Sequence, residues 1–170
     1  NTIINNLCLG GERNIAIGTN TFENGLVAHN TFVNASDTGG KGSANVWINR
    51  GTYRNARFVN NIVFQEDRVA IARVDVRGVM FSHNNWSKRP ARTCRGRGDV
   101  IKDPRLLKSG RLGSGQLRPE WFKILADSPV KDRGQTIGEV VEDYFKTPRR
   151  GAPDIGAHEL LSPPHRLSLR

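Results

Sequence analysis

Four short segments of this chain align with one another, and each is centred on an asparagine. The segments span residues 3–8, 27–32, 58–63 and 81–86, and their anchor asparagines are Asn6, Asn30, Asn61 and Asn84. Successive anchors lie 24, 31 and 23 residues apart. A repeat of this length, with two short apolar runs and no helical period, indicates one structural unit per repeat that stacks on the next. The repeat therefore predicts a solenoid of β-coils.

Apolar residues keep fixed places around each anchor. Three residues before the anchors stand Ile3, Val27, Phe58 and Phe81, and two residues after them stand Cys8, Phe32, Val63 and Trp86. We expect each set to form one buried column. Asparagine suits the bend between the columns because it tolerates a left-handed backbone and can bond to its own main chain. Stacked amides can also pair from coil to coil. The competing interpretation is that the asparagines only mark hairpin turns of a β-sandwich.

The pattern predicts an all-β chain in three parts. Residues 1–87 form about three to four coils, in which residues 14–17, 45–49 and 69–77 supply a second strand. Residues 88–160 are a basic loop followed by a C-terminal capping segment, and residues 161–170 are a tail. Cys8 falls in an inward column and Cys94 in the basic loop, so no disulfide is expected between them. The first coil would be covered by upstream coils or by another chain.

Composition limits the partners. The formal net charge of +10 attracts polyanions, whether nucleic acid, acidic polysaccharide or an anionic surface. No motif of a nucleic-acid-binding protein accompanies that charge, so nucleic acid is not expected as a partner. No apolar run reaches the length of a membrane span. No phosphate-binding loop, nucleophile elbow or paired-cysteine metal site is present, and no cofactor is indicated.

The part after the coils carries a more specific pattern. The chain shows SHNNW at residues 82–86, DP at 103–104, SPVKDRG at 128–134 and PDIGAHE at 153–159, in that order. This series resembles the ending of secreted bacterial proteins of the pectate-lyase-like superfamily. His158 stands where those proteins have tyrosine, and Lys131 where they have a small apolar residue.

The resemblance implies a right-handed parallel β-helix closed by its C-terminal segment, in a protein that is secreted or on the cell surface. It also implies an extended acidic polysaccharide as the ligand, with a polysaccharide lyase or glycoside hydrolase as the enzyme class. Fold alone does not decide whether the chain is catalytic. The alternative is a non-catalytic adhesin, surface or structural solenoid module. Ca²⁺ would need several oxygens that converge, and five aspartates beside glycine or proline read more simply as turn residues.

Strand alternation brings one set of polar and aromatic residues to the outside. These candidate binding residues are Trp47, Asn49, Arg73, Asp75 and Arg77. An indole ring can stack on a sugar, and arginine can bind a carboxylate with two hydrogen bonds. Arg73 and Arg77 are also candidates for the base of a lyase. The competing interpretation is a solvent-facing strand on which Arg73, Asp75 and Arg77 pair with one another. His29 and His83 precede anchors and are expected to be structural.

Overall fold

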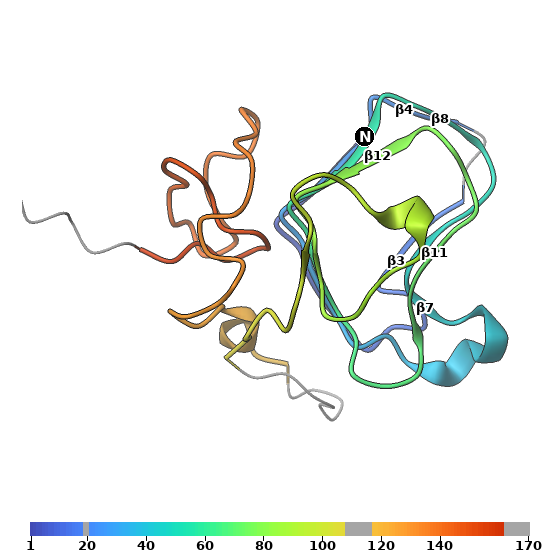
Figure 1. The fold of residues 1–170 in the computed structure, drawn as a ribbon, viewed down its shortest axis with the longest axis horizontal. Coiled ribbons are helices and arrows are strands. Elements are labelled where there is room, and N and C mark those ends of the chain that lie inside the picture. The colour runs from blue at the N-terminus through green and yellow to red at the C-terminus, as the bar shows by residue number, and fades with distance from the viewer. Residues whose placement is uncertain (19–20, 108–116, 162–170) are drawn as a thin grey trace, which may run out of the picture.

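The computed structural model describes residues 1–18, 21–107 and 117–161 (Figure 1). In these ranges the chain is nearly all-β, and every pairing between named strands is parallel. Sheet A contains β1 (Thr2–Ile4), β5 (Leu26–Ala28), β9 (Ala56–Val59) and β12 (Val79–Ser82). Sheet B contains β2 (Leu7–Leu9), β6 (Thr31–Val33), β10 (Ile62–Phe64), β13 (Asn85–Trp86) and β14 (Val100–Ile101). Sheet C contains β3 (Ile15–Ile17), β7 (Ala44–Ile48) and β11 (Ala70–Val74), and sheet D contains β4 (Thr21–Glu23) and β8 (Thr52–Arg54).

The chain visits these sheets in a repeating order. Strands β1 to β4 run through sheets A, B, C and D, and β5 to β8 repeat that order. The third pass supplies β9 to β11, and the fourth supplies β12 and β13. Viewed down the direction of stacking, the passes overlie one another (Figure 1). This arrangement is consistent with a β-solenoid.

Both predicted columns are present. Ile3 pairs with Val27, Val27 with Phe58, and Phe58 with Phe81 in sheet A. The second column follows sheet B, in the order Cys8, Phe32, Val63 and Trp86. The Phe58 ring lies 5.3 Å from that of Phe81 and 6.1 Å from that of Trp86, centroid to centroid. The two columns thus meet in one core inside the coils.

The left-handed residue at each bend is the one before the anchor, which corrects the role expected for the anchor itself. Asn5, His29, Asn60 and His83 have φ angles of 54°, 53°, 55° and 51°. The anchors instead form the expected ladder of amides. The Oδ1 of each anchor accepts the main-chain N–H of the previous one, at 2.9 Å from Asn6, 3.0 Å from Asn30 and 2.9 Å from Asn61. The residue before each anchor therefore adopts the left-handed conformation, and the anchor itself forms the ladder of hydrogen bonds.

A short plug, residues 88–98, closes the end of the stack beyond the fourth pass. It contains the 3-10 helix η2 (Arg92–Cys94), which packs against β11 and is drawn inside the outline of the coils in Figure 1. Cys94 is fully buried in the core with Phe81 and Trp86. The basic loop expected here is thus a folded segment that Cys94 anchors in the core, and both cysteines are free thiols.

The C-terminal segment, residues 117–161, covers the side of the stack rather than its end (Figure 1). It begins with the 3-10 helix η3 (Pro119–Phe122). Phe122, Ile124 and Ile155 pack on the outer side chains of sheet B, and Ile137 and Val140 pack on those of sheet A. The C-terminal segment therefore packs on the coils, as a capping segment was expected to do, but it covers their side, and η2 closes the end. All but the first residue of the predicted tail, 161–170, lie outside the described residues.

Candidate functional site

The outer face of sheet C brings an aromatic ring and a guanidinium group together. Parallel register places Trp47 of β7 between Ala16 of β3 and Arg73 of β11. Val46 and Ile48 point into the core, so alternation turns Trp47 outward, where it is half-buried. Arg73 is exposed. A side chain at Gly18 would approach the indole ring to 3.0 Å, so the absence of one there gives the ring its room.

A second arginine reaches the same ring. The guanidinium carbon of Arg13 lies 4.6 Å from the centroid of the Trp47 ring, which is within range of a cation–π contact. Glu12 holds Arg13 through an ion pair of 2.9 Å, and Nε of Arg13 donates to the main-chain oxygen of Gly42 at 3.4 Å. Sequence reasoning missed Arg13 because it shares the parity of the inward residues Ile15 and Ile17. The chain bends at Asn14, so the alternation of inward and outward side chains along β3 does not extend back to Arg13.

The other three predicted residues extend this face. Asp75 and Arg77 are exposed beyond the end of β11, whereas Val74 is buried and Val76 is half-buried, so the alternation of inward and outward side chains continues as far as Arg77. Asn49 is half-buried, and its main-chain N–H donates to Ile17 at 2.9 Å. No ion pair joins Arg73, Asp75 and Arg77, all of which the structure describes. The ion pairing among these three residues that the competing interpretation predicts is therefore not formed.

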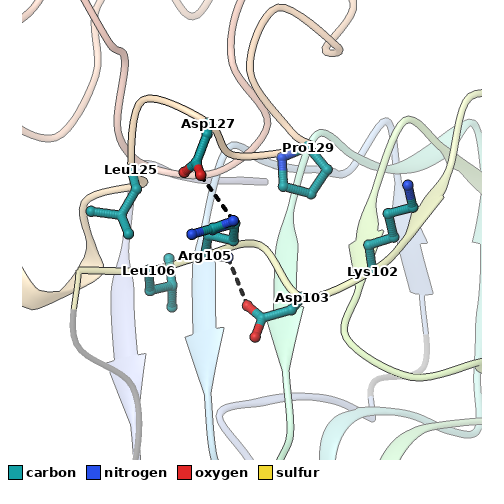
Figure 2. Close-up of a pocket in the computed structure, with 7 residues that line it drawn as sticks. All are labelled: Lys102, Asp103, Arg105, Leu106, Leu125, Asp127 and Pro129. Carbon is teal, nitrogen blue, oxygen red and sulfur yellow. Dashed lines mark hydrogen bonds and ion pairs between the residues drawn. The ribbon is translucent and has the colours of Figure 1, made fainter.

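A separate cavity of about 670 Å³ opens between the loop after β14 and the C-terminal segment (Figure 2). Arg105 pairs with Asp127 at 2.8 Å, and its main-chain N–H donates to Asp103 at 2.7 Å. Leu106, Leu125 and Pro129 supply its apolar lining. Main-chain bonds between residues 105–107 and 123–125 fix its walls. None of the predicted binding residues lines this cavity.

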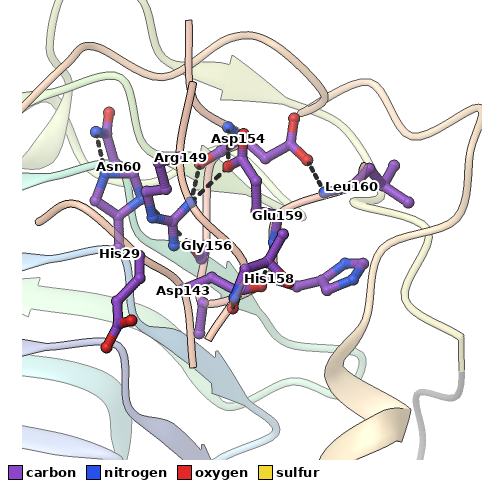
Figure 3. Close-up of polar contacts among 12 residues, drawn as sticks. His29, Asn60, Asp143, Arg149, Asp154, Gly156, His158, Glu159 and Leu160 are labelled. Atoms are coloured by element: carbon purple, nitrogen blue, oxygen red, sulfur yellow. Dashed lines mark hydrogen bonds and ion pairs between the residues drawn. The ribbon is translucent and has the colours of Figure 1, made fainter. Parts of the chain in front are cut away.

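The most strongly buried charges lie where the C-terminal segment meets the bends of the coils (Figure 3). Nη1 of Arg149 pairs with Glu159 at 2.8 Å, and Nη2 donates to the main-chain oxygen of Gly156 at 2.9 Å. Asp154 accepts main-chain N–H groups of Asp132 and Leu160, each at 2.7 Å. These side chains hold the 153–159 segment to itself and to the chain before it. Sequence reasoning gave Asp154 a turn role and did not identify Arg149.

Burial controls the ionisation of this cluster. It lowers the pKa of His29 to about 3 and that of His158 to about 4, and the charge of Arg149 acts in the same direction on both. Burial raises the pKa of Glu159 to about 7, while Arg149 opposes that rise. Neutral His29 donates from Nδ1 to Gly156 at 3.3 Å and accepts at Nε2 from Asn60 at 2.8 Å. Its contacts are those of a structural residue, in keeping with its place in the repeat.

Within the described ranges, no three His, Cys, Asp or Glu side chains are grouped so as to hold a metal ion. No helix in those ranges has the length and apolar character that a membrane span requires. A scan against models of protein families finds no match for this chain, and a search of curated proteins finds no significant match either. Any function inferred for the chain therefore rests on the geometry of the outer face of sheet C.

Proposed function

We propose that the coils are part of a right-handed parallel β-helix of the pectate-lyase-like kind. The repeated order of sheets A to D and the unbroken registers support this reading. The 153–159 segment supports it as well, because its bonds attach it to the coils. The main-chain N–H of Gly156 donates to Asn60 at 2.8 Å, and that of Ala157 donates to the hydroxyl of Thr31 at 3.0 Å. A segment that attaches to the coils in this way is expected in proteins that share the fold, whatever their activity.

The function that we propose is binding of an extended, acidic polysaccharide on the outer face of sheet C. One observation carries this proposal: Trp47 lies in register with Arg73 and within cation–π distance of Arg13. An aromatic ring can pack on the apolar face of a sugar, and guanidinium groups beside it can bind the carboxylate. Asn49 and Asp75 add acceptors that suit sugar hydroxyls. The charge of +10 would draw such a polymer to the protein.

Cleavage of the polymer is a further step of the same proposal. Arg73 and Arg77 are the candidates for the base of a lyase, and a secreted polysaccharide lyase or glycoside hydrolase is the class that we propose. Ca²⁺ and other cofactors remain outside the proposal, since binding by Trp47 and the arginines needs none. The alternative is a non-catalytic adhesin, surface or structural module, which would bind without forming product or would not bind at all.

Affinity electrophoresis in gels that contain polygalacturonate or alginate tests the proposal. Wild-type protein should be retarded, and Trp47→Ala should be retarded less than wild type. Exposed Arg133, on the C-terminal segment, provides a control through Arg133→Ala, which should be retarded like wild type. Ultraviolet absorbance of an unsaturated product, measured in parallel, separates a lyase from a binding module. Equal migration of wild type with and without polymer would end the proposal.

A further inference from the structure

The plug that closes the stack carries concentrated positive charge. Residues 88–98 contain five Lys or Arg side chains and no Asp or Glu. Arg89, Arg92, Arg95 and Arg97 are exposed. None of these four forms an ion pair with another residue of the described ranges. The sequence patterns did not single out their role, and nothing in the core requires four guanidinium groups at this place.

The plug is held firmly at both ends. Nζ of Lys88 donates to the main-chain oxygen of Val69 at 3.0 Å, before β11. Oδ2 of Asp99 accepts the N–H of Gly96 at 2.9 Å and the indole N–H of Trp86 at 3.0 Å. Gly96 passes so close to Phe81 that a Cβ would lie 1.7 Å from the main-chain oxygen of Phe81. The arginines are therefore presented on a fixed backbone, which lowers the entropy lost when a ligand binds.

The plug adjoins the edge of sheet C that β11 forms. Helix η2 contacts β11, which is the last strand of that sheet and carries Arg73. Asp75 lies near enough to Cys94 for its charge to contribute to the raised pKa of the buried thiol. Nε and Nη2 of Arg95 both donate to the main-chain oxygen of Pro90, at 3.1 and 3.0 Å, which fixes its guanidinium on the plug. Positive charge thus continues from sheet C onto the end of the stack.

We propose that the outer surface of the plug, with Arg89, Arg92, Arg95 and Arg97, is a second anion-binding surface that continues the site on sheet C. This inference rests on the proposed function and extends it. The ligand that spans both surfaces carries a negative charge on each of many successive units, as a polyuronate does. A polyphosphate fits less well, because it has no hydroxyl group to donate to Asp75, which follows β11 and lies near Cys94 of the plug. The same carboxylate accepts hydrogen bonds from sugar hydroxyls.

Titration calorimetry with two ligands tests the inference. A galacturonate trisaccharide serves as a ligand for Trp47 and Arg73 alone, and polygalacturonate as one that reaches the plug. The test variant is Arg89→Gln with Arg92→Gln, because no hydrogen bond or ion pair of the described residues involves those side chains. The control is Arg133→Gln with Arg150→Gln, which removes the same charge from exposed positions of the C-terminal segment. Circular dichroism confirms that both variants are folded.

The plug variant should bind polygalacturonate roughly 3- to 30-fold more weakly than wild type, the range expected for two exposed charge pairs. Its affinity for the trisaccharide should not change, and the control should behave as wild type with both ligands. Equal losses in plug variant and control would overturn the inference and leave the proposed function standing. Absence of trisaccharide and polymer binding in wild type would overturn both. Tighter binding of duplex DNA than of polygalacturonate, lost in the plug variant, would overturn the assignment to a glycan.

Discussion

Oδ1 of Asp99 accepts a hydrogen bond from the main-chain N–H of Asn84 at 2.9 Å. In the earlier passes, the anchor asparagine of the next pass accepts this bond. The second oxygen of Asp99 binds the plug through Gly96 and the core through Trp86. A carboxylate only accepts hydrogen bonds, so it cannot pass the ladder on as an amide does. Asp99 therefore ends the asparagine ladder and fastens the segment that closes the stack.

Asp99→Asn should loosen the plug. Whichever way the amide of the new asparagine turns, its NH₂ group faces at least one N–H group that the carboxylate accepted, so at least one hydrogen bond is lost. The free energy of unfolding should therefore fall by about 2 kcal/mol. Buried Cys94 reports on the change. In a Cys8→Ser background, the rate of modification by a thiol reagent should rise well above that of the protein with Asp99 intact. An unchanged rate would mean that Asp99 does not fasten the plug.

The asparagine ladder should contribute unequally along the stack. Oδ1 of Asn61 accepts from the main chain and the side chain of Asn30, and Nδ2 donates to main-chain oxygens of two passes. Asn61→Ala leaves these buried groups without partners and should cost about 3–5 kcal/mol in urea unfolding. Asn6 is exposed and its Asn6→Ala variant should lose about 1 kcal/mol or less. A loss for Asn61→Ala that is no larger than the loss for Asn6→Ala would contradict this difference.

The C-terminal segment should depend on Gly156. Its φ angle of 99° favours glycine, and a Cβ would lie 2.5 Å from Cδ1 of Ile62. Gly156→Ala should lower the free energy of unfolding by about 2–3 kcal/mol and increase binding of a hydrophobic dye, because the outer face of sheet B becomes exposed. Gly138→Ala is the matched control, since a Cβ there meets open space. Thermal unfolding that is the same for both variants would contradict this docking.

Stability should depend on pH through His158. Its pKa is lowered from 6.5 to about 4, so between those values the unfolded state binds more protons and stability rises with pH. Glu159 acts in the opposite direction, because a pKa raised from 4.5 to about 7 gives stability that is lost as pH rises through 7.

The His158→Gln variant isolates the histidine. Its amide oxygen can still accept the N–H of Ile124, which Nδ1 of His158 accepts at 3.1 Å. Between pH 4.5 and 6.5 the slope of unfolding free energy against pH should be smaller than that of wild type by up to about 1.4 kcal/mol per unit. Urea unfolding across this range measures the slope. Parallel wild-type and variant curves would mean that His158 titrates normally in the folded protein.

The columns could be predicted from the repeat because each pass needs an apolar side chain at the same inward positions. Phe58 and Phe81 could be placed as neighbours from spacing alone. The plug could not be predicted, because Cys94 and Gly96 occur once and their packing follows no period. Arg149 was missed for a related reason: its contacts with Asn5, 144 residues away, depend on how the C-terminal segment returns to the coils. The alternation of side chains along a strand predicted that Trp47 and Arg73 share the outer face. Arg13 could not be placed in this way, because a bend separates it from its strand.

We propose that the outer face of sheet C binds an acidic glycan through Trp47 and Arg73. Calorimetric titration with polygalacturonate and with its methyl ester, which lacks the charge, is the measurement that tests this binding. Trp47→Ala should weaken binding of both polymers by about 1–2 kcal/mol, through lost contact with the sugar ring. Arg73→Ala should weaken binding of the acidic polymer alone by up to about 1 kcal/mol, an effect that fades as salt is added. Wild-type affinity of both variants for both polymers would contradict the claim.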